Sequence, residues 1–128
     1  MKVLLDTCAF LWFLADSPQL SPAARTHIED PENEVYLSAI SVWEIARKYA
    51  QGKISLPAHP AILIPGLRHD SGIASLPLTE ADALAAEKLQ RFHKDPFDRM
   101  LIAQALMGGM AIVTSDRAFE PYPVRIIW

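Results

Sequence analysis

Short apolar runs alternate along the chain with longer segments in which apolar residues recur at helical spacing. Each run is continuous rather than interrupted by polar residues, which is typical of a strand buried on both faces of a sheet. Polar or glycine-containing turns precede most of the runs. They predict strands at residues 2–5, 35–37, 73–76 and 111–114 and, with a weaker pattern, at residues 124–127.

The segments between these runs contain helix start signals. Ser41 and Glu44 have the spacing of a capping box, which predicts a helix that begins at Ser41. A second helix is predicted to begin at Thr79. A third is predicted to begin at Asp95, where an acidic cap precedes a proline, and to end at Gly108. Two further helical patterns cover residues 11–14 and 57–66.

Strands that alternate with helices predict an α/β fold, in which a central parallel sheet has helices on both faces. Right-handed crossovers place the strand-to-helix turns of such a sheet at one edge, at the carboxyl ends of the strands. The chain has 128 residues, the size of one ordinary domain. We therefore predict a single domain over residues 1–128.

The composition excludes several classes of protein. Hydrophobic residues make up 51% of the chain and charged residues 21%, which is too apolar for a chain that stays disordered. Cys8 is the only cysteine, so a disulfide scaffold is excluded and a buried place in the core is predicted for this thiol. No stretch approaches the ~20 apolar residues of a membrane span. We expect a soluble, cytoplasmic protein with no membrane partner.

The net charge of the chain excludes fewer classes of protein than its composition does. The formal net charge is −3 and the isoelectric point is near 5.7. These values are not typical of a protein that coats nucleic acid without specificity, where the isoelectric point usually exceeds ~9. They are compatible with an enzyme that holds nucleic acid on a local basic strip.

Four acidic residues follow the predicted strands or open the predicted helices. Asp6 and Asp116 come directly after strands, whereas Glu44 and Asp98 lie in the first turns of helices. These positions fall at the carboxyl edge of the sheet, where ligands bind in open α/β sheets. The sequence therefore predicts that the four carboxylates converge on one rim.

Such a convergence has an electrostatic consequence. Carboxylates within ~5–6 Å of one another repel by about 3 kcal/mol for each pair at an effective dielectric constant of ~20. The cluster is stable only if some carboxylates hold protons or a cation lies among them. Oxygen ligands without a cysteine or histidine favour Mg²⁺ or Mn²⁺ over zinc. A hard ion with positions open to phosphate oxygens suits the hydrolysis of a phosphodiester bond.

Each acid also has a structural interpretation. Glu44 completes the predicted capping box, and Asp98 stabilises the N-terminus of its helix by charge alone. Asp95 is a good N-cap before proline, and Asp116 is placed to cap a short turn. Asp6 has no predicted capping role, because it ends an apolar strand. No single one of these acids is strong evidence of a functional site. Their common position at the carboxyl edge of the sheet is what favours one.

The four acids lie in four short motifs, namely LLDT at residues 4–7, SAISVWEI at 38–45, HKDPFDRMLIA at 93–103 and VTSD at 113–116. In this order and spacing, the motifs resemble those of the PIN-domain family of ribonucleases. Within that family they are similar to the VapC-type toxins of bacterial toxin–antitoxin pairs. The third motif has the form of one VapC-like subgroup, and the resemblance covers essentially the whole chain.

The resemblance implies a three-layer α/β/α fold around a parallel sheet. It also implies endonucleolytic cleavage of RNA with Mg²⁺ or Mn²⁺. The acids of the family map onto Asp6, Glu44, Asp98 and Asp116. Of these, Asp6, Asp98 and Asp116 would hold the metal ion, and Glu44 would either bind the metal ion or orient the attacking water.

The resemblance also implies supporting residues and partners. The hydroxyls of Thr7 and Ser115 would help to arrange the site. Asp95, which belongs to the subgroup's form of the third motif, would support it. Toxins of this type form homodimers and are silenced by a small antitoxin protein. The predicted helix at residues 11–14 is apolar all round, which suggests that one side of it meets the second protomer or the antitoxin.

Several positively charged or titratable residues lie close to the acids in the sequence. Phosphate contacts position a nucleic acid, so the cations are candidates for holding the RNA backbone. The alternative interpretation is that these cations form salt bridges on a solvated face of the protein. His93, close before Asp95, could face the site, but a surface or capping role is the favoured interpretation. The candidate cations are Arg47, Lys48, Arg99 and Arg117.

Two functions of other classes stay open on the sequence. A receiver-like phosphoacceptor domain is also a doubly wound sheet with acids at this rim. It would place an aspartate after a middle strand and a lysine after a late strand, but here proline follows the third strand and Arg117 follows the late one. The second alternative is a non-catalytic module, in which the acids bind a metal or nothing and a partner surface carries the function.

Overall fold

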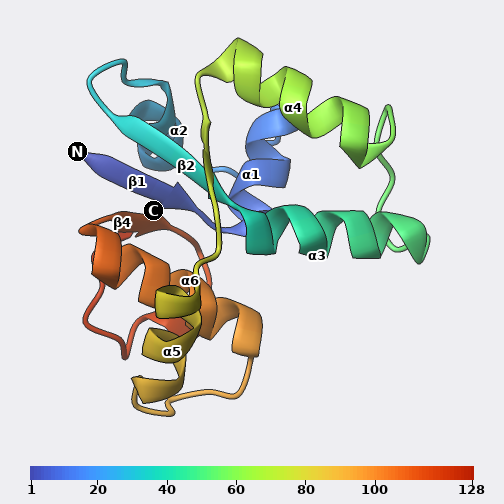
Figure 1. Cartoon of the computed structure of the whole chain (residues 1–128). Coiled ribbons are helices and arrows are strands. Elements are labelled where there is room, and N and C mark those ends of the chain that lie inside the picture. Colours follow the sequence, from blue (N-terminus) through green and yellow to red (C-terminus); the bar gives the residue numbers. More distant parts are fainter.

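All five predicted strands are present, and they form one sheet. The strands are β1 (Lys2–Leu5), β2 (Glu34–Ser38), β3 (Ala74–Leu76), β4 (Ala111–Val113) and β5 (Ile126–Ile127). The computed structural model describes residues 1–128 and orders the strands β3-β2-β1-β4-β5, with every neighbouring pair parallel (Figure 1). In the central strand β1, Leu5 lies beside Leu37 on one side and Val113 on the other. The predicted parallel sheet is confirmed.

Six α-helices connect the strands. They are α1 (Thr7–Leu14), α2 (Pro22–Glu29), α3 (Ala39–Ala50), α4 (Pro60–Ser71), α5 (Glu80–Lys88) and α6 (Pro96–Gly108), and a 3₁₀ turn follows at Arg117–Phe119. Helix α2 was not predicted, although Ser21 caps it and proline follows the cap, as at the start of α6. Helix α4 begins at Pro60, later than the predicted segment, and continues through Pro65 to Ser71.

The alternating side chains of β1 divide the core into two layers. Val3 and Leu5 pack into the larger cluster, which also contains Ile45 of α3 and Ile64 of α4. Leu4 points to the opposite face and packs into a smaller cluster formed mainly by α6 and the C-terminal segment. Figure 1 shows α1, α2 and α4 on one side of the sheet and α5 and α6 on the other. The three-layer α/β/α fold is therefore confirmed.

The start of α3 differs from the prediction. The N-cap is Ser38, whose hydroxyl oxygen accepts a hydrogen bond from the Ile40 N–H at 3.1 Å. Ser41 therefore lies inside the first turn, where it is buried and its hydroxyl has no partner. Glu44 consequently lies in the second turn, and the predicted capping box does not form. The physical reason is that β2 continues to Ser38 and enters the helix without a loop.

Helix α6 begins and ends where the sequence predicted. The Asp95 carboxylate caps it by accepting hydrogen bonds from the N–H groups of Phe97 at 2.9 Å and Asp98 at 3.3 Å. Gly109 ends it with a φ of 64°, a left-handed conformation that glycine adopts without strain. The two caps fix the direction of the helix, and they place its N-terminus at the carboxyl edge of the sheet.

The apolar residues 11–14 belong to α1 and are half-buried against the larger core cluster. Trp12 also contacts Trp128, with 5.7 Å between ring centroids. The segment is therefore covered in part by the chain itself, and its contact with a partner stays a prediction. None of the six helices combines the length and apolarity that a membrane crossing requires.

Candidate active site

The four predicted acids line one pocket at the carboxyl edge of the sheet. Asp6 follows β1, Asp116 follows β4 by way of Thr114, Asp98 lies in the first turn of α6, and Glu44 lies in the second turn of α3. The pocket has a volume of about 180 Å³. Its wall also includes Thr7, Cys8, Lys48, Asp95, Leu101, Ser115 and Phe119. Residues from four separate parts of the sequence thus meet at the edge where α/β folds bind ligands.

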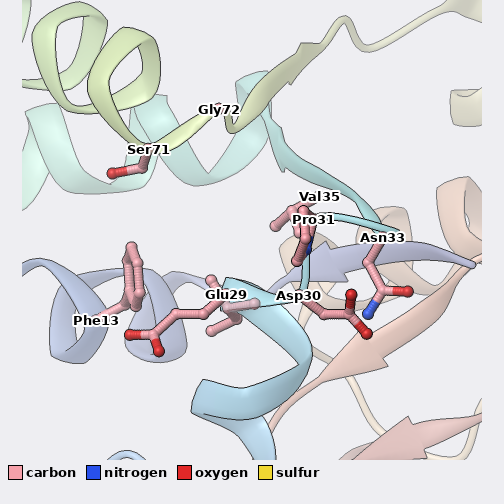
Figure 2. Close-up of a pocket in the computed structure, with 9 residues that line it drawn as sticks. Phe13, Glu29, Asp30, Pro31, Asn33, Val35, Ser71 and Gly72 are labelled. Atoms are coloured by element: carbon pink, nitrogen blue, oxygen red, sulfur yellow. The ribbon is translucent and has the colours of Figure 1, made fainter.

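A larger pocket lies at the opposite edge of the sheet. It has a volume of about 410 Å³ and is formed where α1, α2 and α4 meet the start of β2 (Figure 2). Its titratable side chains are Glu29 and Asp30, and Arg25 already pairs with Glu29 at 3.4 Å. The smaller pocket is therefore the better candidate, because it gathers carboxylates whose pKa values are perturbed.

Asp6 is the most buried acid of the pocket, with 9% of its surface exposed. Burial raises the pKa of its carboxyl group, and the charges of Asp116 and Glu44 raise it further, whereas hydrogen bonds from Thr114 and Ala9 oppose the rise. The Ala9 N–H donates to Oδ1 of Asp6 at 2.7 Å, so that Asp6 is the N-cap of α1. The prediction that Asp6 has no capping role was wrong, because β1 also enters its helix directly.

Asp98 holds its proton more tightly than an isolated aspartate does. Burial is the main cause, followed by the charge of Asp95, and the pKa of Asp98 rises to about 6. The nearby Asp116 also raises this pKa, whereas a hydrogen bond from His93 opposes the rise. Nε2 of His93 lies 3.3 Å from Oδ2 of Asp98. Two of the four acids thus resist ionisation, as expected of carboxylates crowded without a cation.

The orientation of His93 is set by two further residues. Nη1 of Arg99 lies 3.3 Å from the Tyr122 hydroxyl, which in turn lies 2.7 Å from Nδ1 of His93. Because arginine has only donors, the hydroxyl accepts from Arg99, and it also lies within hydrogen-bonding distance of Nδ1. The imidazole is thus held between Tyr122 and Asp98. His93 is therefore a neighbour of the site, and the favoured surface or capping role was wrong.

We expect the pH to change the stability contribution of Asp98 in a defined direction. Its folded-state pKa of about 6 exceeds the ordinary value of 3.8, so the folded chain binds this proton more tightly than the unfolded chain. Stability from this group is present below about pH 4 and is lost as the pH rises to about 6. With a chelator present, Asp98→Asn should raise the free energy of unfolding at pH 7 by at most about 3 kcal/mol.

This prediction is checked by urea denaturation of the wild type and Asp98→Asn across pH 4 to 7. The difference between the two proteins should be small at the acidic end and grow with pH. Asp70→Asn is a matched control, because Asp70 is exposed and forms no ion pair. A difference that stays constant across this range contradicts the assignment.

Glu44 has a cationic partner within its own helix. Nζ of Lys48 lies 3.7 Å from Oε2 of Glu44, one helical turn away, and both side chains are partly exposed. The ion pair places a positive charge at the rim of an otherwise acidic pocket. Lys48 is thus the one predicted RNA-binding cation that lines the pocket together with the four acids.

The predicted supporting residues line the same pocket in different ways. Thr7 is buried in the first turn of α1, and Ser115 is exposed beside Asp116. Thr114, which the sequence did not single out, is buried and its hydroxyl accepts a hydrogen bond from the Asp116 N–H at 3.0 Å. Asp116 then caps the 3₁₀ turn by accepting from the Ala118 N–H at 2.9 Å. The predicted turn-capping by Asp116 is confirmed.

Two predictions about single residues were wrong. Arg99 is buried, and its guanidinium donates to the main-chain oxygens of Ala86, Leu89 and Gln90 rather than facing solvent. It is therefore a structural residue of the α5–α6 contact and has no free surface for RNA. Cys8 is exposed and lines the carboxylate pocket, because it lies on the open side of the first turn of α1.

The donor set of the pocket fits a hard divalent cation. It consists of carboxylate oxygens, which Mg²⁺ and Mn²⁺ prefer. No group of three or more histidine, cysteine, aspartate or glutamate side chains already has an arrangement that could hold an ion. Burial raises the pKa values of Asp6 and Asp98, and repulsion from neighbouring carboxylates raises them further. The same repulsion would oppose a tighter arrangement in the absence of a cation.

Comparison with known proteins gives a consistent result. The family model described as "PIN domain" matches residues 3–124. Ribonuclease VapC22 of Mycobacterium tuberculosis is 33% identical over 129 residues, covering 97% of each chain. VapBC2 from Rickettsia felis, solved with a promoter DNA fragment, aligns with a TM-score of 0.72 and 12% identity over 98% of this chain and 97% of the other. For VapBC-1 from nontypeable Haemophilus influenzae, the TM-score is 0.69 and the identity 17%, over 98% and 96% of the two chains.

Proposed function

Because the chain belongs to the PIN domain family, we propose that it is the endoribonuclease toxin of a toxin–antitoxin pair. The observation that supports this most directly is the pocket at the carboxyl edge of the sheet, which gathers Asp6, Glu44, Asp98 and Asp116. The relative that is 33% identical, over 97% of each chain, is named a ribonuclease. PIN ribonucleases are metal-dependent, and the carboxylate donors of this pocket favour Mg²⁺, with Mn²⁺ as its closest substitute.

The acids of the pocket divide into two roles. Asp6, Asp98 and Asp116 come from the centre of the sheet edge and would hold the divalent ion. When bound, that ion supplies a Lewis acid for the phosphoryl oxygen, makes nearby water more acidic and neutralises developing charge. Glu44 is already paired with Lys48, so we assign it the task of orienting the attacking water and accepting its proton.

The surrounding residues position the acids and the substrate. Thr114 and Ala9 hold the carboxylate of Asp6 by hydrogen bonds, and Tyr122 orients His93 toward Asp98. The exposed Arg47 and Arg117, with Lys48 at the rim, would contact RNA phosphates. Asp95 serves by capping α6, which fixes the main chain at Asp98.

The test of this function is an RNA cleavage assay with the purified chain. Cleavage should require Mg²⁺ or Mn²⁺ and should stop when EDTA is added. A circular RNA substrate distinguishes endonucleolytic cutting, because it has no end for an exonuclease. Absence of cleavage with every metal would favour the non-catalytic alternative, and stable phosphorylation by a small phosphodonor would favour the receiver-like one.

The partners are part of the same proposal. Two structural neighbours that align over 98% of this chain are named VapBC2 and VapBC-1, which supports a small antitoxin as the partner of this chain. A homodimer, a cytoplasmic location and an RNA substrate follow from the family resemblance. Sedimentation of the chain alone and with its co-expressed partner measures both assemblies, and a monomer at all concentrations would reject the homodimer.

A further inference from the structure

We propose that Trp43, Phe97 and Arg47 form an aromatic platform on which an unpaired base of the RNA substrate stacks beside the carboxylate pocket. This inference rests on the proposed ribonuclease function and extends it to a binding site for one base beside the acids. The site requires an unpaired base, since a base held inside a duplex cannot stack on a side chain.

The platform is formed where α3 meets the start of α6. The ring centroids of Trp43 and Phe97 are 5.1 Å apart, with 52° between the ring planes. The guanidinium carbon of Arg47 lies 5.3 Å from the centroid of the Trp43 ring, one helical turn further along α3. Trp43 is 49% exposed. About half of a large aromatic side chain therefore faces solvent, with its orientation restrained by a ring and a cation.

A second pocket connects this platform with the acids. It has a volume of about 210 Å³ and includes Phe97, Arg47 and Lys53 in its wall. Its wall also contains Glu44, Lys48 and Asp95, all of which line the carboxylate pocket as well. The two pockets are therefore adjacent, and a nucleotide next to the cleaved phosphate would reach the second pocket.

The charges of the second pocket favour a phosphate-bearing ligand. Arg47 and Lys53 form no ion pair with any carboxylate, whereas Lys48 pairs with Glu44. Unpaired cations beside an exposed aromatic ring are the combination with which proteins bind single-stranded nucleic acid. A single strand of RNA presents a base for the ring and phosphates for these cations within one repeating unit, and we therefore assign the surface to RNA.

Binding is tested in the Asp6→Asn background, so that RNA is not cut during the measurement. The probes are a short oligoadenylate, an abasic ribose-phosphate chain of the same length and the oligoadenylate annealed to its complement. Trp43→Leu should lower the affinity for single-stranded oligoadenylate by about ten-fold. It should leave the affinity for the abasic chain unchanged, and the duplex should bind weakly in both proteins.

Three further variants sharpen this test. Trp43→Phe keeps a ring and should restore most of the lost affinity, whereas Arg47→Gln should weaken binding of both single-stranded probes. Phe97→Leu repeats the base-dependent loss at a second position, which keeps the test valid if Trp43→Leu folds poorly. Trp128→Leu is the matched control, because Trp128 is also partly exposed but lies outside both pockets.

The outcomes separate this inference from the proposed function. A wild-type chain that cuts RNA, together with a Trp43→Leu variant that binds oligoadenylate normally, rejects the platform alone. A chain that neither cuts nor binds RNA rejects both. Equal losses on the oligoadenylate and the abasic chain would show that Trp43 does not act through the base, and would overturn the platform. A changed sedimentation coefficient in Trp43→Leu would assign Trp43 to a protein contact and overturn it as well.

Discussion

Replacing Asp6 with asparagine is expected to lower metal-dependent RNA cleavage by more than about 100-fold while raising the melting temperature of the metal-free chain. The cleavage falls because asparagine removes a negative charge from the donors that would hold the metal ion. The stability rises because the carboxylate is buried and its pKa is raised by that burial and by neighbouring acids. Asparagine keeps an oxygen for the Ala9 N–H and is as good an N-cap as aspartate.

The opposite signs of the two effects make this test specific. A purely structural Asp6 would lose stability and activity together, whereas a metal ligand loses activity and gains stability when no metal is present. Asp70→Asn, at an exposed position of α4, should leave both measurements unchanged. Wild-type cleavage by Asp6→Asn would remove Asp6 from the mechanism.

The largest loss of stability is expected at Arg99. Arg99 is 4% exposed, and its guanidinium donates to the carbonyls of Ala86 and Leu89, both at 2.9 Å, in the last turn and C-cap of α5. It also donates to the Gln90 carbonyl at 3.1 Å. Arg99→Met keeps the length of the side chain but removes these three hydrogen bonds. The carbonyls of Ala86 and Gln90 still accept from main-chain N–H groups, whereas the Leu89 carbonyl loses its donor. The free energy of unfolding should fall by about 3 kcal/mol, which corresponds to a melting temperature lower by roughly 10 °C.

The measurement is a denaturant titration or a thermal melt of the metal-free chain. Arg117→Met is the matched control, because Arg117 is exposed and forms no ion pair, and its substitution should change stability by less than about 0.5 kcal/mol. If Arg99→Met were as stable as the wild type but bound RNA more weakly, the result would support the RNA contact that the sequence predicted for Arg99.

Much of the site could be predicted because its positions are set by local rules. Asp6 and Asp116 follow strands, and Asp98 follows the helix cap at Asp95, so that a parallel sheet alone brings them to one edge. The sequence also placed Glu44 near that edge, although it assigned the start of α3 incorrectly. This error did not remove Glu44 from the pocket. The start of α3 differs from the prediction by less than one helical turn, so the helix still begins at the carboxyl edge of the sheet.

The failures share a different cause. Cys8 was predicted to be buried from its residue type, but its exposure depends on which side of α1 meets the sheet. For His93 a surface or capping role was favoured over one that faces the site, and its orientation toward Asp98 depends on Tyr122, which lies 29 residues away in the sequence. No local pattern links His93 to Tyr122, so the sequence could not decide between the two roles.

The sequence by itself determined the order of strands and helices, the parallel sheet and the edge at which the acids gather. It could do so because apolar periodicity and end caps act between residues close along the chain. Only the tertiary structure decided that Arg99 supports α5 and that Trp43 and Phe97 lie against each other at an open surface. The exposure of a long or aromatic side chain depends on which element packs over it, and that packing is decided between segments far apart in the sequence.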